Sequence, residues 1–232
     1  MQGARPDTGG YVARSDTSGK QRMPYRLFVP KGYDKTKRYP LIVWLHGAGG
    51  AGSDNLRQIS EDQVPGTRLW VKAENQAKHP AFVVAPQSDS AWTTGIESPG
   101  LQPDPRLVSG ILDALSSEFP IDRTRVYLLG QSLGATAAWN LATNNPDRFA
   151  AVLLVCPSLR NVTRSSRAAR LPLWVFQGDK DSLIVTTREL VDAVTRSGGR
   201  PRFTVYPNEG HDIWTRVFAE PGLVEWLFAQ AR

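Results

Sequence analysis

A serine in the setting Gly130-Gln131-Ser132-Leu133-Gly134 is the residue best placed to do chemistry in this chain. The pentapeptide follows the apolar run Val126–Leu129 and leads into an alanine-rich stretch, residues 135–142, that is typical of a helix. A strand, G-x-S-x-G and a helix in that order form a sharp turn that exposes the serine hydroxyl, and the two glycines avoid Cβ collisions in it. The pattern therefore predicts Ser132 as the nucleophile of an acyl transfer.

Such a serine needs a histidine to take its proton and a carboxylate to orient that histidine. With this turn the three groups follow along the chain as serine, acid, histidine. The sequence contains three histidines, His46, His79 and His211, and only His211 comes after Ser132. It lies in a polar loop after the strand-like segment 202–206. We therefore expect His211 to be the base.

Two aspartates are candidates for the acid. Asp179 and Asp181 both follow the apolar run Leu171–Phe176, which is typical of a buried strand. Either carboxylate could reach a histidine from the end of that strand. Position along the chain leaves the choice between them open.

A glycine-rich loop is the expected source of the oxyanion hole. The apolar run Leu41–Leu45 ends in His46-Gly47-Ala48-Gly49-Gly50-Ala51-Gly52, where backbone N–H groups can approach a developing oxyanion without obstruction. The expected donors are the amides of Ala48 and Leu133. We expect His46 to organise this loop by hydrogen bonding and not to act as a second base.

The elements that must position these residues form an alternating pattern. Apolar runs typical of buried strands lie at 41–45, 81–85, 126–129, 150–155 and 171–176. Helix-like stretches separate them, with Leu107–Leu115 forming one amphipathic face and Leu190–Val194 another. Strands buried on both faces, with helices between them, predict an α/β fold with a doubly wound, mostly parallel sheet and helices on both faces.

Several segments resemble one enzyme family, the small carboxylesterases and predicted peptidases close to feruloyl esterases and polyhydroxybutyrate-depolymerase-like enzymes of the α/β-hydrolase superfamily. The likeness extends over nearly the whole chain from about Tyr11 onward. The segments that carry it are Pro24–Tyr33, Tyr39–Gly47, Ala85-Pro86-Gln87, Pro146–Ala151 and Gly210–Trp214.

The resemblance implies a single-domain α/β-hydrolase fold and hydrolysis of short acyl or aryl esters, including hydroxycinnamoyl (feruloyl) esters. Gly178-x-x-Asp181 followed by apolar residues resembles the acid loop of these enzymes, which implies Asp181 as the acid and Asp179 as a turn residue. The chain departs from relatives at Leu133 and Ala135, where they often have Met and Gly, and at Gln177, where they often have His. These departures bear on pocket shape more than on chemistry.

Ligands of open α/β sheets bind at the carboxyl ends of the strands. We therefore expect loops at that end to form the substrate pocket. The candidate pocket residues are Gln131, Trp92, Leu183, Ile184 and Trp214.

Composition excludes several other classes. The net charge is +6, but no basic and aromatic motif accompanies it, so we expect no nucleic-acid partner. Arg160, Arg164, Arg167 and Arg170 have near-helical spacing, typical of a solvated face, with a cleft border that attracts anionic substrates as the alternative. One cysteine and scattered histidines predict no metal site, and the absence of a dinucleotide fingerprint predicts no cofactor.

Further expectations concern the chain ends and the compartment. Residues 1–10 have the composition of a flexible N-terminal arm, ahead of a catalytic domain at 11–232. No apolar stretch is long enough to span a membrane and no apolar leader is visible, which indicates a cytoplasmic enzyme or a secreted one whose leader has been removed. The expected partner is a small-molecule or polysaccharide-linked ester, and oligomeric state is left open. A serine peptidase and a non-catalytic binding domain are the alternative functions.

Overall fold

The computed structural model describes residues 7–16, 22–90, 92, 105–159 and 165–232. The N-terminal arm expected at residues 1–10 therefore lies mostly outside the described residues. In the part that is described, no helix combines the length and the apolar character needed to cross a membrane.

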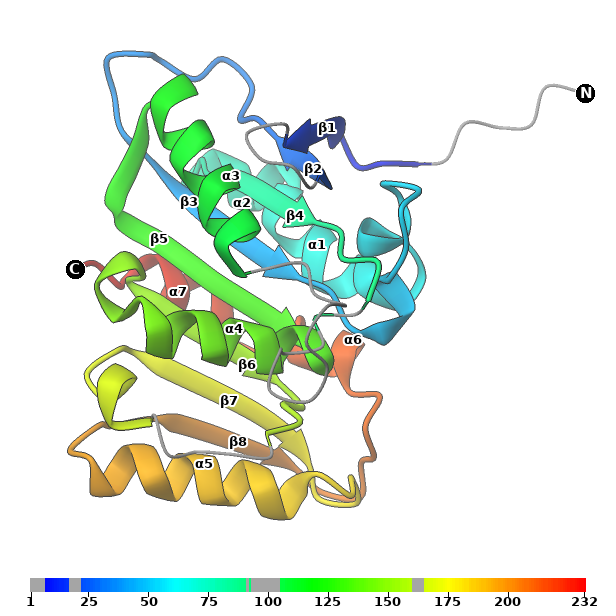
Figure 1. The fold of residues 1–232 in the computed structure, drawn as a ribbon, viewed down its shortest axis with the longest axis vertical. Helices are drawn as coiled ribbons and strands as arrows, with labels where there is room; N and C mark the ends of the chain where they lie inside the picture. The colour runs from blue at the N-terminus through cyan, green and yellow to red at the C-terminus, as the bar shows by residue number, and fades with distance from the viewer. Residues whose placement is uncertain (1–6, 17–21, 91, 93–104, 160–164) are drawn as a thin grey trace, which may run out of the picture.

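A single twisted sheet runs through the described part of the protein (Figure 1). Its strands are β1 (Val12–Asp16), β2 (Met23–Phe28), β3 (Tyr39–Leu45), β4 (Phe82–Pro86), β5 (Ile121–Gln131), β6 (Ala151–Val155), β7 (Leu173–Gly178) and β8 (Arg202–Tyr206). Their order across the sheet is β1-β2-β4-β3-β5-β6-β7-β8. The strands from β4 to β8 in that order are parallel, whereas β1 and β2 pair antiparallel at one edge. The carboxyl ends of the parallel strands consequently meet at one end of the sheet.

Helices cover both faces of the sheet. They are α1 (Val64–Val71), α2 (Ala73–Lys78), α3 (Pro105–Glu118), α4 (Leu133–Asn144), α5 (Ile184–Arg196), α6 (Trp214–Val217) and α7 (Leu223–Phe228). In Figure 1, α3, α4 and α5 lie in front of the sheet, and α1, α2, α6 and α7 lie behind it. This two-sided cover confirms the predicted doubly wound architecture.

The residues of β3 show how the sequence supports two separate cores. Leu41, Val43 and Leu45 belong to the apolar cluster that contains the buried residues of α3, α4 and α5. Ile42 and Trp44 belong to the second cluster, together with buried residues of α1, α6 and α7. Successive side chains of a strand point to opposite faces, so an uninterrupted apolar run is what a sheet covered on both sides requires.

The antiparallel edge is the part of the sheet that was not predicted. β1 is the short polar segment Val-Ala-Arg-Ser-Asp, and β2 contains Pro24, so neither shows the apolar run of a buried strand. β1 has a strand on one side only, and it pairs with β2 from Val12 to Asp16. In β1, Val12, Ala13 and Ser15 are exposed, so burial imposes no apolar pattern on this strand.

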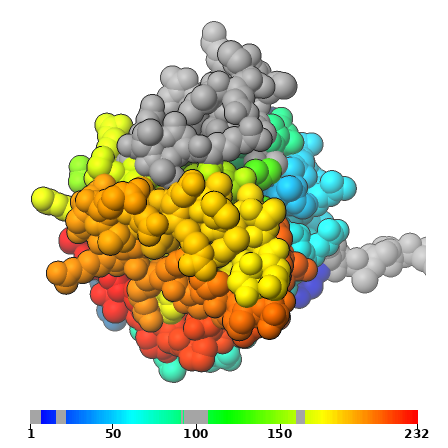
Figure 2. Space-filling model, turned by 90° about the horizontal axis from the view of Figure 1, so that it is seen from below, coloured from blue at the N-terminus to red at the C-terminus, as the bar shows by residue number. Residues whose placement is uncertain are grey.

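The opposite edge is built from the C-terminal part of the chain. Figure 2 looks onto this edge, where residues coloured yellow to red form most of the visible described surface. β8 and α5 belong to this region, and so do the loops that follow β7 and β8. These loops carry the candidate acid and the candidate base.

Candidate active site

Ser132 lies in the turn between β5 and α4 with a φ of 54°. A positive φ is uncommon for a residue other than glycine and marks a strained turn. A Cβ added at Gly130 would lie 2.3 Å from the carbonyl oxygen of Gly134, and one added at Gly134 would lie 2.1 Å from that of Leu45. Both glycines are therefore required by close backbone approach, and the sharp turn predicted from the sequence is present.

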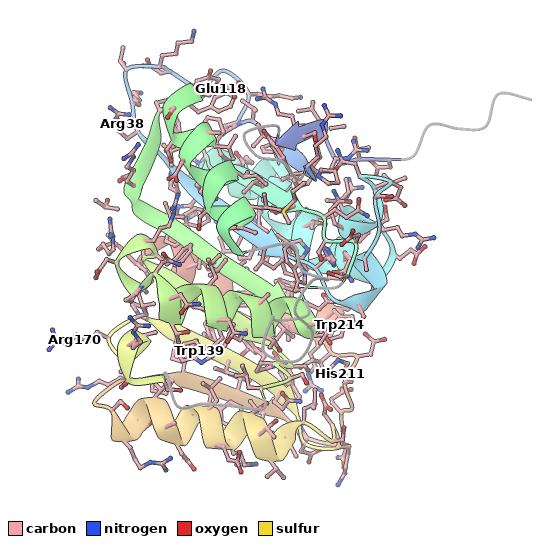
Figure 3. All side chains as sticks on the ribbon, viewed as in Figure 1. Arg38, Glu118, Trp139, Arg170, His211 and Trp214 are labelled. Atoms are coloured by element: carbon pink, nitrogen blue, oxygen red, sulfur yellow. The ribbon has the colours of Figure 1, made fainter. Side chains whose placement is uncertain are left out.

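His211, in the loop between β8 and α6, lies against Ser132. Its Nε2 is 2.9 Å from Ser132 Oγ, and its Nδ1 is 2.6 Å from Asp181 Oδ2. Because an ionised carboxylate only accepts hydrogen bonds, the proton belongs on Nδ1, which leaves Nε2 free to accept from the serine hydroxyl. His211 and Trp214 lie at the same end of the sheet in Figure 3, with their rings edge to face at 5.2 Å.

Asp181, and not Asp179, is the aspartate in contact with His211. Its side chain is only 3% exposed, and the amide of Leu183 donates to its Oδ1 at 3.0 Å. Burial alone raises the pKa of the Asp181 carboxyl, but hydrogen bonds from Leu183, His211 and Gln177 outweigh burial and leave the pKa below its ordinary value. Asp181 is therefore held as an anion beside the histidine.

The two candidate oxyanion donors are each the first residue of a helix. Ala48 begins the short 3-10 helix η1 (Ala48–Gly50), and Leu133 begins α4. The first N–H groups of a helix have no acceptor within it, and neither of these amides donates to another described residue. Ala48 is exposed and Leu133 is half-buried. Both amides are therefore available to an oxygen bound beside Ser132.

His46 organises the loop that carries Ala48. Its Nδ1 lies 2.7 Å from the carbonyl oxygen of Gly47, and its Nε2 accepts a hydrogen bond from the Ser88 amide at 3.0 Å. Both ring nitrogens are occupied in the neutral form, and burial lowers the pKa of His46 to about 4. His46 consequently has no lone pair to offer a substrate.

The pocket candidates fall into two groups. Leu183 and Ile184 are half-buried beside the acid loop. Gln131 and Trp92 are buried: the Gln131 amide lies 3.3 Å from Asp62 Oδ2, and the Trp92 indole N–H donates to the His46 carbonyl at 2.9 Å. Trp214 is 6% exposed and packs against His211. Of the aromatic candidates, Trp92 therefore contacts the His46 loop and Trp214 contacts the base.

Two glutamines contact the site: Gln63 was not singled out in the sequence, and Gln177 was noted there only as a departure from relatives that bears on pocket shape. Gln63 accepts from the Gly47 amide at 2.9 Å, and Gln177 donates to Asp181 Oδ2 at 2.5 Å. Both side chains are fully buried. A buried polar side chain is nearly always hydrogen-bonded, so the position of Gln177 directly after the apolar residues of β7 was a usable signal.

One group in the described part of the chain has the spacing of a metal site. The thiol of Cys156, a carboxylate oxygen of Asp181 and a ring nitrogen of His211 lie within 4.8 Å of one another. Their separation along the chain concealed this juxtaposition. The Asp181–His211 hydrogen bond already joins two of these atoms, so a cation there would replace the proton that this bond needs.

The arginine segment is only partly described. Arg160 and Arg164 lie outside the described residues. In Figure 3, Arg170 lies at the end of the sheet away from His211. This agrees with its place just before β7, at the amino end of the strand. Arg170 therefore does not border the candidate triad.

Acid should destabilise the protein through His46. In the unfolded chain the imidazole of His46 is protonated below its ordinary pKa of about 6.5. In the folded protein the same imidazole stays neutral until the pH falls to its lowered pKa of about 4. Stability that is present above pH 6.5 is therefore lost as the pH falls toward 4. We expect His46 alone to remove about 2 kcal/mol of unfolding free energy between pH 8 and pH 5.

Urea unfolding of the wild type and of His46→Gln at both pH values measures this contribution. The variant should be less stable at pH 8 but should lose less stability on acidification. Equal losses in the two proteins would contradict the assignment. His79→Gln is the matched control, because His79 is half-buried outside the site and stacks on Phe228.

Comparisons with known proteins agree with this geometry. A family model named Esterase and described as "Putative esterase" matches residues 17–212. A "Probable feruloyl esterase C" of Aspergillus terreus is 31% identical over 140 residues, which cover 59% of this chain and 48% of that protein. "Putative esterase NocK" of Nocardia uniformis is 26% identical over 217 residues, covering 81% and 60%. This chain thus spans roughly half of these curated relatives.

A solved structure extends the likeness to three dimensions. The crystal structure of a thermostable esterase superposes with a TM-score of 0.88 at 32% identity, covering 97% of this chain and 64% of the other. The fold described above is therefore that of a known esterase.

Proposed function

Since the chain belongs to the esterase family described by that model, we propose that it is a serine carboxylesterase whose catalytic domain spans residues 11–232. The observation that carries the proposal is the continuous hydrogen-bonded line from Asp181 through His211 to Ser132, with distances of 2.6 and 2.9 Å. In this proposal Ser132 is the nucleophile, His211 the general base and Asp181 the residue that orients it.

Hydrolysis proceeds in two steps. Ser132 Oγ attacks the ester carbonyl while its proton passes to His211 Nε2, and His211 then donates that proton to the departing alkoxide. Water then attacks the acyl-enzyme and gives a proton to His211, and His211 returns that proton to Ser132 Oγ as the bond to the serine breaks and the acid is released. The imidazolium formed in each step is stabilised by the buried Asp181 carboxylate.

The amides of Ala48 and Leu133 bind the oxyanion of both tetrahedral intermediates. Donors already in place at the site of developing charge lower the barrier without reorganisation. His46 and Gln63 hold the loop that presents Ala48, through their bonds to Gly47.

The acyl group is proposed to contact Leu183 and Ile184, the half-buried apolar residues beyond the acid. These side chains suit a short aliphatic or an aromatic acyl group. The relatives named feruloyl esterases extend the candidates to hydroxycinnamoyl esters, free or linked to polysaccharide.

A substrate panel tests this proposal. p-Nitrophenyl acetate and methyl ferulate should be hydrolysed faster than the matched anilides and peptide amides, because alkoxide and phenoxide leave more readily than an amine. Activity should fall in acid, because His211 must be neutral to accept the Ser132 proton. EDTA should leave the rate unchanged.

A clear preference for peptides over matched esters would favour a serine peptidase. Failure to hydrolyse any ester, together with failure to react with a fluorophosphonate, would favour a non-catalytic binding domain. Loss of activity in EDTA would contradict the metal-free mechanism.

A further inference from the structure

A second row of buried hydrogen bonds reaches the candidate acid, in addition to the one from the histidine. Thr187 of α5 donates from Oγ1 to Gln177 Oε1 at 2.9 Å, and Gln177 Nε2 donates to Asp181 Oδ2 at 2.5 Å. Thr187 and Gln177 are fully buried, and Asp181 is 5% exposed. The row ends on the same oxygen atom that accepts the proton of His211 Nδ1.

The chemistry of the partners determines the direction of these bonds. A carboxylate only accepts, so the amide nitrogen of Gln177 faces Asp181 and its oxygen faces Thr187. The Thr187 hydroxyl has one proton, and the alternative acceptor, the Pro157 carbonyl, is 3.5 Å away against 2.9 Å for Gln177. Thr187 therefore holds the Gln177 amide in the orientation that donates to Asp181.

A neutral donor at this place has two effects on the candidate triad. It fixes the plane of the Asp181 carboxylate together with the Leu183 amide, which donates to the other oxygen. It also withdraws electron density from Oδ2, and so weakens the attraction of that atom for the His211 proton. Unlike a carboxyl or an amine, an amide keeps the same charge across the working pH range.

We propose that Gln177, held by Thr187, is a positioning residue that sets the direction and strength of the Asp181–His211 hydrogen bond. This inference rests on the proposed esterase function. Gln177 acts through Asp181 and does not touch the reacting atoms.

Other ionisable groups surround this carboxylate. The Cys156 thiol is within 4.8 Å of it, and burial raises the pKa of that thiol so that it stays neutral. The loop after β7 carries Asp179 and Lys180. The loop after β8 carries Asp212 and Glu209, and Glu209 is paired with Arg216 at 2.7 Å. None of these groups changes in the variants below.

Two substitutions of Gln177 test the proposal. Gln177→Met retains length but removes the donor. We expect kcat to fall about tenfold with KM within about twofold, and the acid limb of the pH–rate profile to move up by about half a pH unit, because an unopposed Oδ2 holds the His211 proton more strongly. Gln177→Glu retains shape, and because a carboxyl buried beside the Asp181 carboxylate should have a raised pKa and stay protonated, its O–H can donate to Oδ2 and the limb should stay near that of the wild type.

Thr187 provides an independent pair of variants. Thr187→Val should cause a smaller loss and shift of the same sign, and Thr187→Ser, which keeps the hydroxyl, should restore both. Thr195→Val is the matched control, since Thr195 lies exposed on α5 and donates only to the Val191 carbonyl of its own helix. Thermal unfolding identifies any variant that fails to fold. If a Gln177 variant fails to fold, the Thr187 variants test the proposal, and the reverse also holds.

The His211 ring can be followed by NMR in the same proteins, because the chain contains only three histidines. The pH midpoint of its titration should move with the acid limb. This measurement needs no substrate. If the protein hydrolyses no ester, the proposed function is disproved, but the effect of the Gln177 and Thr187 variants on the His211 titration can still be measured. A loss of kcat with an unmoved limb and unmoved ring titration would overturn the proposal in favour of a purely structural role.

Discussion

Replacing Ser132 with alanine should lower kcat for ester hydrolysis by at least about 10⁴-fold and leave the protein folded. Removal of a triad nucleophile typically costs several powers of ten, because the residual rate comes only from the oxyanion donors and from binding. Folding should be little affected, because alanine meets the same positive φ of 54° that serine already tolerates. Steady-state kinetics with p-nitrophenyl acetate, with circular dichroism as a check on the fold, measure both parts.

A matched control is available on α3. Ser117→Ala removes a serine hydroxyl that is exposed and donates only to the Asp113 carbonyl, and its rate should equal that of the wild type. Fluorophosphonate labelling should be lost in Ser132→Ala and retained in Ser117→Ala. Near-normal turnover by pure Ser132→Ala protein would eliminate the proposed mechanism.

Replacing Asp181 with asparagine should lower kcat/KM by about 10³- to 10⁴-fold. The change removes the negative charge that stabilises the His211 imidazolium. It also leaves a mispaired amide in either orientation. An asparagine nitrogen at the Oδ1 position would face the Leu183 N–H, and one at the Oδ2 position would face the donors of Gln177 and His211.

Asp179→Asn is the comparison that decides between the two aspartates. The Asp179 amide donates to the Tyr206 carbonyl at 3.1 Å, a backbone contact that asparagine retains. Its effect on kcat/KM should stay within about threefold, as for a turn residue. If Asp179→Asn is the more damaging change, the acid has been assigned to the wrong aspartate.

The sequence by itself determined the features that depend on neighbouring residues. The apolar runs predicted the central strands, because a strand buried on both faces must be apolar at every position. Gly130, Ser132 and Gly134 predicted the strained turn, because only glycine fits where backbone approaches so closely. His211 followed from its place in chain order, and the resemblance to known esterases indicated Asp181.

The tertiary structure decided the contacts between side chains that are distant along the chain. Asp179 and Asp181 share one loop, and only the packing of β7 against β8 turns Asp181 toward His211. Trp92 was predicted to line the pocket, and the structure adds a contact that the sequence did not indicate, in which its indole N–H donates to the His46 carbonyl. Gln177 acquires its partners from α5 and from the acid loop together. Periodicity and turn chemistry depend on residues that are close together along the chain. The direction of a side chain depends instead on long-range packing, which no short segment contains.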